Sequence, residues 1–286
     1  MKQRQLGPDG PQVSAIGLGG MYMSITGRPD EAQAIRAIHA ALDAGVTFLD
    51  TADVYCLDDT EIGHNERLFA RALRGRSETV VVATKGGLRR PKGSWTRDGS
   101  PEHLTQACEQ SLIALGVQSI DLYQLHAPDS KVPFLESVGA IARLREAGKV
   151  RRVGLSNVDA QEIAEAARIV PIASVQNRWN AGHRHPEQDG VIAACEAAGI
   201  AFLPYSPFGG ASGAKSLGSM KGLAAEAEKR GVSPHRLVLA WMLARSPVVI
   251  PIPGVRRAET AIDSAAAADL ELSPDDVTAV QASFGG

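Results

Sequence analysis

Residues 46–50, VTFLD, show the strand pattern that recurs along the chain and predicts its fold. This stretch is a short apolar run that ends in a polar residue, and TVVVATK at 79–85 repeats that form further along the chain. Runs rich in Val, Ile and Leu that alternate with helical segments are typical of βαβ units and a parallel sheet. The candidate strands along the chain are IGLGG (16–20), VTFLD (46–50), TVVVATK (79–85), IDLYQLH (120–126), VRRVGLSN (150–157), IASVQ (172–176), IAFLPYS (200–206) and VVIPIPG (248–254).

The segments between these runs carry helix signals. In residues 30–45, Ile35, Ile38 and Leu42 fall on one face of a helix, and Gly45 suits the position just after its end. Three serine-proline pairs, at 100–101, 233–234 and 273–274, resemble a helix cap followed by proline as the first helical residue. Further helices are predicted after Ser100, Val132, Asp159, Asp189, Ser233 and Ser273.

Eight candidate strands are the number that closes a (β/α)₈ barrel. Before them, KQRQL (2–6) and QVSA (12–15) flank a Pro-Asp-Gly turn and predict a β-hairpin. No linker interrupts the pattern. We therefore predict an α/β protein in which residues 1–286 form a single (β/α)₈ TIM barrel with an N-terminal β-hairpin and a C-terminal helix.

An open sheet of the Rossmann type is the alternative architecture. Its phosphate-binding fingerprint, GxGxxG, would have to lie in IGLGGMY, where Gly17 and Gly19 are present. The third glycine falls on Tyr22, so the fingerprint fails and the closed barrel is favoured.

Composition limits the kinds of partner that the protein can have. Thirty Lys and Arg against 32 Asp and Glu give a net charge of -2, so no overall basic field attracts nucleic acid or an anionic membrane. No apolar run approaches the roughly 20 residues of a membrane helix, and the N-terminus lacks the apolar region of a signal peptide. The three cysteines have no CxxC spacing and are interpreted as free thiols. We expect a cytoplasmic protein, and the pattern gives no indication of its oligomeric state.

Six successive candidate strands end in polar side chains. In a (β/α)₈ barrel the carboxyl ends of the strands and the loops after them build the active site, so these side chains would meet at one mouth. A cap or turn role explains any one of them equally well, but an Asp, a Lys and a His together are harder to explain that way. The six residues are Asp50, Lys85, His126, Asn157, Gln176 and Ser206.

The residues around these strand ends resemble a known family, the aldo-keto reductases. The resemblance covers essentially the whole chain and rests on a specific combination, an aspartate with a tyrosine five residues later, a downstream Thr-Lys and a Leu-His, each at a predicted strand end. The segments that carry it are FLDTADVY (48–55), GHNE (63–66), VVVATK (80–85), IDLYQLH (120–126), VGLSN (153–157), SVQN (174–177) and LPYSPF (203–208).

The resemblance implies a (β/α)₈ barrel that transfers hydride reversibly between NAD(P)H and a carbonyl compound. By position, the implied catalytic residues are Asp50, Tyr55, Lys85 and His126. Hydride arriving at carbon leaves negative charge on oxygen, so a proton donor is needed there, and Tyr55 takes this role. We expect Lys85 to lower the pKa of Tyr55 by roughly 1 to 3 units, Asp50 to hold Lys85, and His126 to orient the carbonyl oxygen.

The same resemblance implies the cofactor-binding residues. Ser156, Asn157 and Gln176 would surround the nicotinamide carboxamide, with Tyr205 stacked on its ring. A glycine-rich loop over the pyrophosphate would begin with Ser206, Phe208 and Gly210, and Gly20 and Met21 would line the mouth.

Arg256 and Arg257 stand at the start of a predicted helix, where two cations are unfavourable unless an anion joins them. The 2′-phosphate of NADPH is such an anion, while solvated loop arginines are the alternative. Family members often carry a basic residue at the position of Thr260 and a Glu-Asn pair at those of Asp263 and Ser264. This chain departs from the family at all three positions, which is why NADH is kept as an alternative. Because of Arg256 and Arg257, we predict NADPH as the cofactor.

Two further motifs carry weaker signals. His183 and His185 form an HxH pair without a third ligand at a suitable spacing, so no metal is predicted. The segment 86–99 is basic and glycine-rich and contains Trp95, which could reach a substrate. This segment is too short to be a nucleic-acid-binding patch.

The predicted partner is a small-molecule carbonyl substrate whose identity the sequence does not reveal. Two other functions stay open. One is a regulatory protein that senses NADP(H) with little turnover, and the other is a phosphate-handling barrel isomerase that would bind no nicotinamide.

Overall fold

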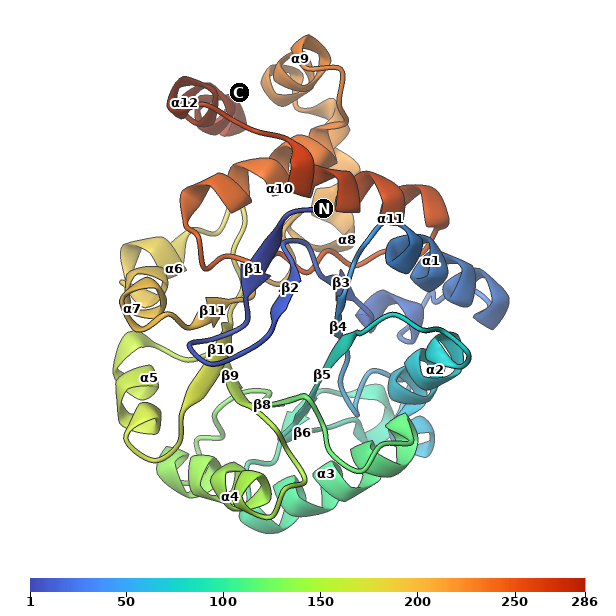
Figure 1. The fold of residues 1–286 in the computed structure, drawn as a ribbon, viewed down its shortest axis with the longest axis vertical. Helices are drawn as coiled ribbons and strands as arrows, with labels where there is room; N and C mark the ends of the chain where they lie inside the picture. The colour runs from blue at the N-terminus through green and yellow to red at the C-terminus, as the bar shows by residue number, and fades with distance from the viewer. Residues whose placement is uncertain (286) are drawn as a thin grey trace.

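The computed structural model describes residues 1–285 and shows a parallel barrel ringed by helices (Figure 1). Seven strands form the sheet, in the spatial order β11-β10-β9-β8-β5-β4-β3, and every pairing in it is parallel. The strands are β3 (Leu18–Gly19), β4 (Phe48–Asp50), β5 (Val81–Gly86), β8 (Leu122–Leu125), β9 (Val153–Ser156), β10 (Ile172–Gln176) and β11 (Ala201–Phe202). The predicted α/β class and (β/α)₈ barrel are thus confirmed.

The eighth predicted run, 248–254, closes the barrel without becoming a regular strand. Pro251 and Pro253 have no N–H to donate to a neighbouring strand, so the ladder is interrupted twice. The carbonyls of these two prolines accept from Gly17 and Gly19 at 2.9 and 3.0 Å, and Ile250 N donates to the Phe202 carbonyl at 2.8 Å. The run therefore bridges β11 and β3 and completes the circle.

Helices alternate with the strands as predicted. Asp30, Ser100, Asp159, Ser233 and Ser273 cap the helices that follow them, each accepting from a backbone N–H in the first turn. The helices are α1 (Glu31–Asp43), α2 (His64–Leu73), α3 (Pro101–Leu115), α4 (Phe134–Glu146), α5 (Ala160–Ala167), α6 (His185–Gln188), α7 (Val191–Ala198), α8 (Gly210–Ser216), α9 (Lys221–Lys229), α10 (Pro234–Arg245), α11 (Ala258–Ala265) and α12 (Pro274–Ala282).

The predicted N-terminal hairpin is formed by β1 (Gln3–Gln5) and β2 (Gln12–Ser14), which pair antiparallel. It lies across one end of the barrel (Figure 1), where Leu6 and Val13 join the buried side chains of the barrel interior. Arg4 donates to the carbonyls of Leu243 and Val249 at 2.6 and 2.7 Å. The hairpin is thereby tied to the end of α10, and the opposite end of the barrel is left open for a site.

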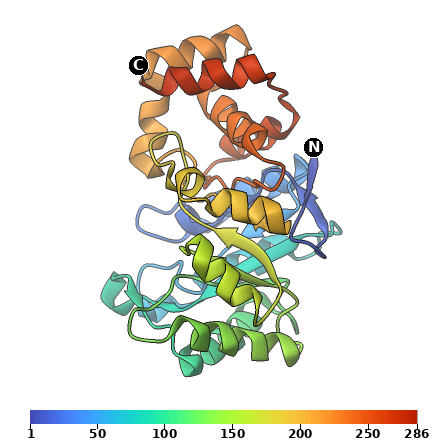
Figure 2. The ribbon, with the colours of Figure 1, turned by 90° about the vertical axis from the view of Figure 1, so that its left-hand side faces the viewer.

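The chain after β11 departs furthest from a simple repeat. The segment predicted as a glycine-rich loop from Ser206 onward contains α8 and a 3₁₀ turn at Leu217–Ser219. Beyond it, α9 and the predicted C-terminal helix α12 lie side by side at the edge of the barrel (Figures 1 and 2). Both helices contact α10, and Trp241 of α10 stacks on Trp179, with ring centroids 5.5 Å apart.

A short antiparallel hairpin follows β5 on the open side of the barrel. Its strands are β6 (Leu88–Arg89) and β7 (Thr96–Arg97), with a 3₁₀ turn at Pro91–Gly93 between them. Within residues 1–285, no helix is both long and apolar enough to cross a membrane.

We predict that none of the three cysteines reacts with a thiol reagent while the protein is folded. Cys56, Cys108 and Cys195 are free and buried, and burial raises their pKa values to about 11, about 12 and about 12. The reactive thiolate is therefore scarce at neutral pH, and the reagent cannot reach it. Titration with an aromatic disulfide reagent should count no fast thiol in buffer and three in denaturant. A fast thiol in buffer would contradict the packing around that cysteine.

Candidate active site

The four predicted catalytic residues meet at the open end of the barrel, around the ammonium of Lys85. Lys85 is fully buried near the end of β5, and its Nζ donates to the two Asp50 carboxylate oxygens at 2.7 and 2.9 Å. The same nitrogen donates to the Thr51 carbonyl at 2.8 Å and to Tyr55 Oη at 3.1 Å. A buried charge is tolerated only when it is paired and hydrogen-bonded, and this ammonium is both paired with a carboxylate and hydrogen-bonded to four oxygens.

Strand register explains how Lys85 and Asp50 come together. Asp50 pairs with Ala83 across the β4–β5 ladder, and Lys85 lies two residues further along, on the same face as Ala83. The turn after β4 then places Tyr55 above the ammonium, where only 6% of its surface is exposed. His126 follows β8, and its ring meets that of Tyr55 edge to face with centroids 5.8 Å apart.

Burial sets the protonation of this cluster. It raises the pKa of Tyr55 well above its ordinary value, and the negative charge of Asp50 adds to the effect. This differs from the expectation that Lys85 would lower that pKa: desolvation of the phenolate and repulsion by Asp50 outweigh the nearby cation. Tyr55 is therefore a protonated phenol at neutral pH.

The pKa values of Lys85 and His126 are shifted in the opposite direction, downward. Burial lowers the pKa of Lys85 despite the opposing effect of Asp50, and it lowers the pKa of His126 well below the ordinary range, with Lys85 adding to that effect. His126 is thus a neutral imidazole. Its Nδ1 is buried and has no hydrogen-bond partner among the described residues.

A cavity of about 930 Å³ opens above this cluster. Of the predicted site residues, only Gly20 and Lys85 stay outside its lining: Lys85 lies beneath Tyr55, and the Gly20 carbonyl accepts from Asn65 Nδ2 at 3.0 Å. The predicted residues that line it are Met21, Asp50, Tyr55, His126, Ser156, Asn157, Gln176, Tyr205, Ser206, Phe208, Gly210, Arg256 and Arg257.

Two of the polar residues predicted to hold the nicotinamide carboxamide, Asn157 and Gln176, are hydrogen-bonded to other residues of the site. Asn157 accepts from Tyr205 Oη at 2.8 Å and donates to the His126 carbonyl at 3.0 Å. Gln176 Nε2 donates to Asp50 Oδ1 at 2.8 Å. Asn157 and Ser206 have φ values of +60° and +51°, an uncommon conformation that turns the backbone sharply at the mouth.

Arg256 and Arg257 lie at the side of the cavity bounded by α11. No ion pair involves either side chain among residues 1–285, and the guanidinium of Arg256 lies 5.2 Å from the ring centre of Tyr22. Asp263, where family members often carry Glu, pairs with Arg236 at 2.8 Å, so its negative charge is neutralised within the fold.

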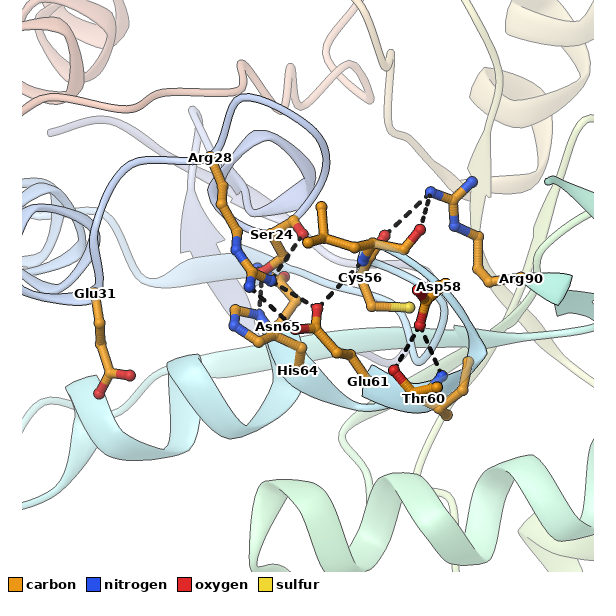
Figure 3. Close-up of polar contacts among 12 residues, drawn as sticks. Ser24, Arg28, Glu31, Cys56, Asp58, Thr60, Glu61, His64, Asn65 and Arg90 are labelled. Atoms are coloured by element: carbon orange, nitrogen blue, oxygen red, sulfur yellow. Dashed lines mark hydrogen bonds and ion pairs between the residues drawn. The ribbon is translucent and has the colours of Figure 1, made fainter. Parts of the chain in front are cut away.

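Sequence reasoning missed the residues that anchor the segment after Tyr55. Arg90, 4% exposed, donates to the carbonyls of Cys56 and Leu57 at 3.1 Å each, and Glu61 pairs with Arg28 at 2.7 Å on the other side (Figure 3). The basic, glycine-rich composition of 86–99 contains no signal that one of its arginines is buried.

Arg90 also connects this segment to the hairpin. Its guanidinium stacks 3.9 Å from the ring centre of Trp95, and the Trp95 ring meets Tyr55 edge to face at 6.4 Å. Trp95 lines the cavity, as its predicted access to a substrate requires.

The HxH pair lies away from this cluster. The rings of His183 and His185 are 4.9 Å apart, and no group of three or more potential metal ligands occurs among residues 1–285.

The fold and the site define a class: a (β/α)₈ barrel enzyme whose strand ends hold a tyrosine, a buried Lys–Asp pair and a neutral histidine beneath a large cavity. The chain belongs to the aldo/keto reductase family, whose sequence profile matches residues 15–283. The predicted family is thereby confirmed.

Solved structures of similar proteins agree with this assignment. The thermostable aldo-keto reductase Tm1743, solved with the inhibitor epalrestat, is 27% identical over 99% of this chain and all of its own, with a TM-score of 0.84. The glycerol dehydrogenase AKR11B4 from Gluconobacter oxydans is 29% identical over 99% of this chain and 94% of its own, with a TM-score of 0.83. An aldo-keto reductase from Klebsiella pneumoniae, solved with NADPH, is 28% identical over 98% and 94%, with a TM-score of 0.82.

We predict that His126→Asn makes folding stability less sensitive to acid. An unfolded histidine takes up a proton near pH 6.5, whereas folded His126 stays neutral because its pKa is lowered. The unfolded state therefore binds more protons below pH 6.5, and stability falls as pH falls. Urea unfolding at pH 7.5 and pH 5 should show a smaller loss of stability in the variant than in the wild type. An equal loss in the two proteins would contradict the neutral assignment.

Proposed function

We propose that this protein reduces aldehydes or ketones with NADPH and that Tyr55 is the proton donor. The observation that carries the proposal is the 3.1 Å hydrogen bond from Lys85 Nζ to Tyr55 Oη at the floor of the cavity. Family membership supports the reaction class, and the Klebsiella pneumoniae relative solved with NADPH supports the cofactor.

The cavity suits a dinucleotide with several phosphates. The part of its lining formed by α8 and the residues just before α11 contains three basic side chains, Lys215, Arg256 and Arg257, and no ion pair among residues 1–285 engages any of them. The two acidic residues of the lining, Asp50 and Asp263, are already paired with Lys85 and Arg236. Arg256 and Arg257 would hold the 2′-phosphate, and the residues around Asn157 and Tyr205 would hold the nicotinamide end.

When bound, NADPH supplies the hydride. Tyr55 Oη then donates its proton to the carbonyl oxygen as negative charge develops there. Lys85 stabilises the phenolate that remains, because its ammonium already donates to that oxygen. Asp50 keeps the ammonium charged and oriented, and neutral His126, beside the Tyr55 ring, hydrogen-bonds the carbonyl oxygen and sets its angle.

We predict that Tyr55→Phe removes most turnover and leaves NADPH binding nearly unchanged, since the variant loses only the hydroxyl. A positioned general acid contributes ~10² to 10⁴ in rate. The measurements are the loss of nicotinamide absorbance with an aldehyde, and a separate fluorescence titration with NADPH. Unchanged turnover would contradict the proton-donor role. A wild type that binds NADPH but turns over no aldehyde would instead favour a sensor of NADP(H).

A second prediction concerns the choice of cofactor. Replacing Arg256 and Arg257 together by Ala should weaken NADPH binding at least about tenfold, because charged hydrogen bonds contribute roughly 1.5 to 3 kcal/mol each before solvent exposure reduces them. NADH carries no 2′-phosphate, so its affinity should change little. The matched control replaces Arg151 and Arg152, an adjacent pair that precedes β9 at the opposite end of the barrel. If the affinities for both cofactors fell equally, the arginines would act on the pyrophosphate that the two cofactors share, or on the stability of the fold.

A further inference from the structure

We propose that the carbonyl substrate carries a carboxylate and that Arg97 binds it, an inference that rests on the proposed reduction at Tyr55. The starting point is the charge balance of the cavity. Its two acidic side chains are neutralised by internal cations, whereas its four basic side chains have no ion-pair partner among the described residues. Three of the four, Lys215, Arg256 and Arg257, belong to the segments proposed to hold the cofactor, and Arg97 is left over.

Arg97 belongs to an element on the opposite side of the barrel from the elements that carry those three cations (Figure 1). It belongs to β7, which pairs with β6 near β8 and α3, whereas α8 and α11 lie across the barrel (Figure 1). A cofactor held by the cations near α8 and α11 therefore leaves Arg97 on the side from which a substrate must approach the Tyr55 hydroxyl.

The register of the hairpin turns Arg97 toward the site. Arg97 is paired with Leu88 across the β6–β7 ladder, and side chains of a cross-strand pair project from the same face. Leu88 packs against the buried cluster that contains Tyr55. Trp95, two residues before Arg97, meets the Tyr55 ring, and Arg97 itself lines the cavity.

The neighbouring arginine, Arg89, behaves differently. It lies on the same hairpin opposite Thr96, its Nε donates to Asp98 at 2.6 Å, and it does not contribute to the cavity lining. The hairpin thus carries one arginine paired within the fold and one directed to the cavity without an anionic partner.

These contacts describe the class of substrate. The substrate must place its carbonyl oxygen at the Tyr55 hydroxyl, at the floor of the cavity. The wall beside this hydroxyl is apolar and is lined by Met21, Leu88 and Trp95. Arg97 offers a planar guanidinium suited to a carboxylate. The substrate that fits is an aldehyde or ketone with an apolar or aromatic body and a carboxylate at its far end.

The test compares two aldehydes of nearly the same shape, 4-formylbenzoate and its neutral methyl ester, with NADPH in excess. The wild type should have the higher kcat/KM for the carboxylate. Arg97→Gln should lower kcat/KM for 4-formylbenzoate about tenfold, mainly by raising KM, because a contact made equally to bound substrate and transition state changes binding alone. The same variant should change kcat/KM for the ester less than about twofold. Arg89→Gln should leave kcat/KM unchanged for both aldehydes.

Three results would overturn the proposal: no preference of the wild type for the carboxylate, equal losses for both aldehydes in Arg97→Gln, or the same effect in Arg89→Gln. A binding measurement separates this failure from failure of the proposed function. Trp95 is 47% exposed, whereas Trp179 and Trp241 are fully buried, so quenching by terephthalate reports on the cavity. If neither aldehyde is reduced but terephthalate binding still weakens about tenfold in Arg97→Gln, the reduction fails and the carboxylate site stands.

Discussion

The structure depends on one buried ion pair, that of Lys85 and Asp50. An ammonium that is fully removed from water would be strongly destabilising without partners, and breaking a buried pair typically destabilises a protein by about 3–5 kcal/mol. Two adjacent parallel strands supply the charges in register, and the turn after β4 adds the Thr51 carbonyl and the Tyr55 hydroxyl. The segment after Tyr55 is then held from two sides, by Arg90 and by the Arg28–Glu61 pair. The position of Tyr55, the proposed proton donor, thus follows from the need of the buried Lys85 ammonium for oxygen partners.

The same arrangement divides the cavity above Tyr55. On one side, the chain after the eighth run and the chain after β11 bring basic side chains that match a phosphorylated cofactor. On the other side, the hairpin after β5 brings Trp95 and Arg97 to the cavity wall, where we propose that the substrate binds. Hydride transfer needs both ligands at the Tyr55 hydroxyl, so a barrel mouth with two separately charged sides is suited to holding them at once.

The sequence predicted the barrel, the hairpin and the meeting of Asp50, Lys85 and His126, because periodicity and polar strand ends are local signals. The place of Tyr55 beside them followed from the resemblance to the aldo-keto reductases. The sequence predicted an eighth strand at 248–254, where Pro251 and Pro253 interrupt the ladder, and a loop where α8 forms. It also predicted the wrong direction for the pKa of Tyr55, since that prediction considered the nearby Lys85 cation and not the burial of the phenol. The role of Arg90 depends on carbonyls more than thirty residues away, which no local pattern reveals.

The pKa of Tyr55 in the free enzyme shows whether burial or the charge of Lys85 controls ionisation of the proposed proton donor. The chain has four tyrosines, so the signal of Tyr55 can be assigned by comparison of ring-labelled wild type with Tyr55→Phe in a ¹³C NMR titration. Burial and Asp50 should keep Tyr55 protonated beyond pH 10, the ordinary midpoint of a phenol. Ionisation below pH 10 would show that Lys85 dominates the site and would contradict the account.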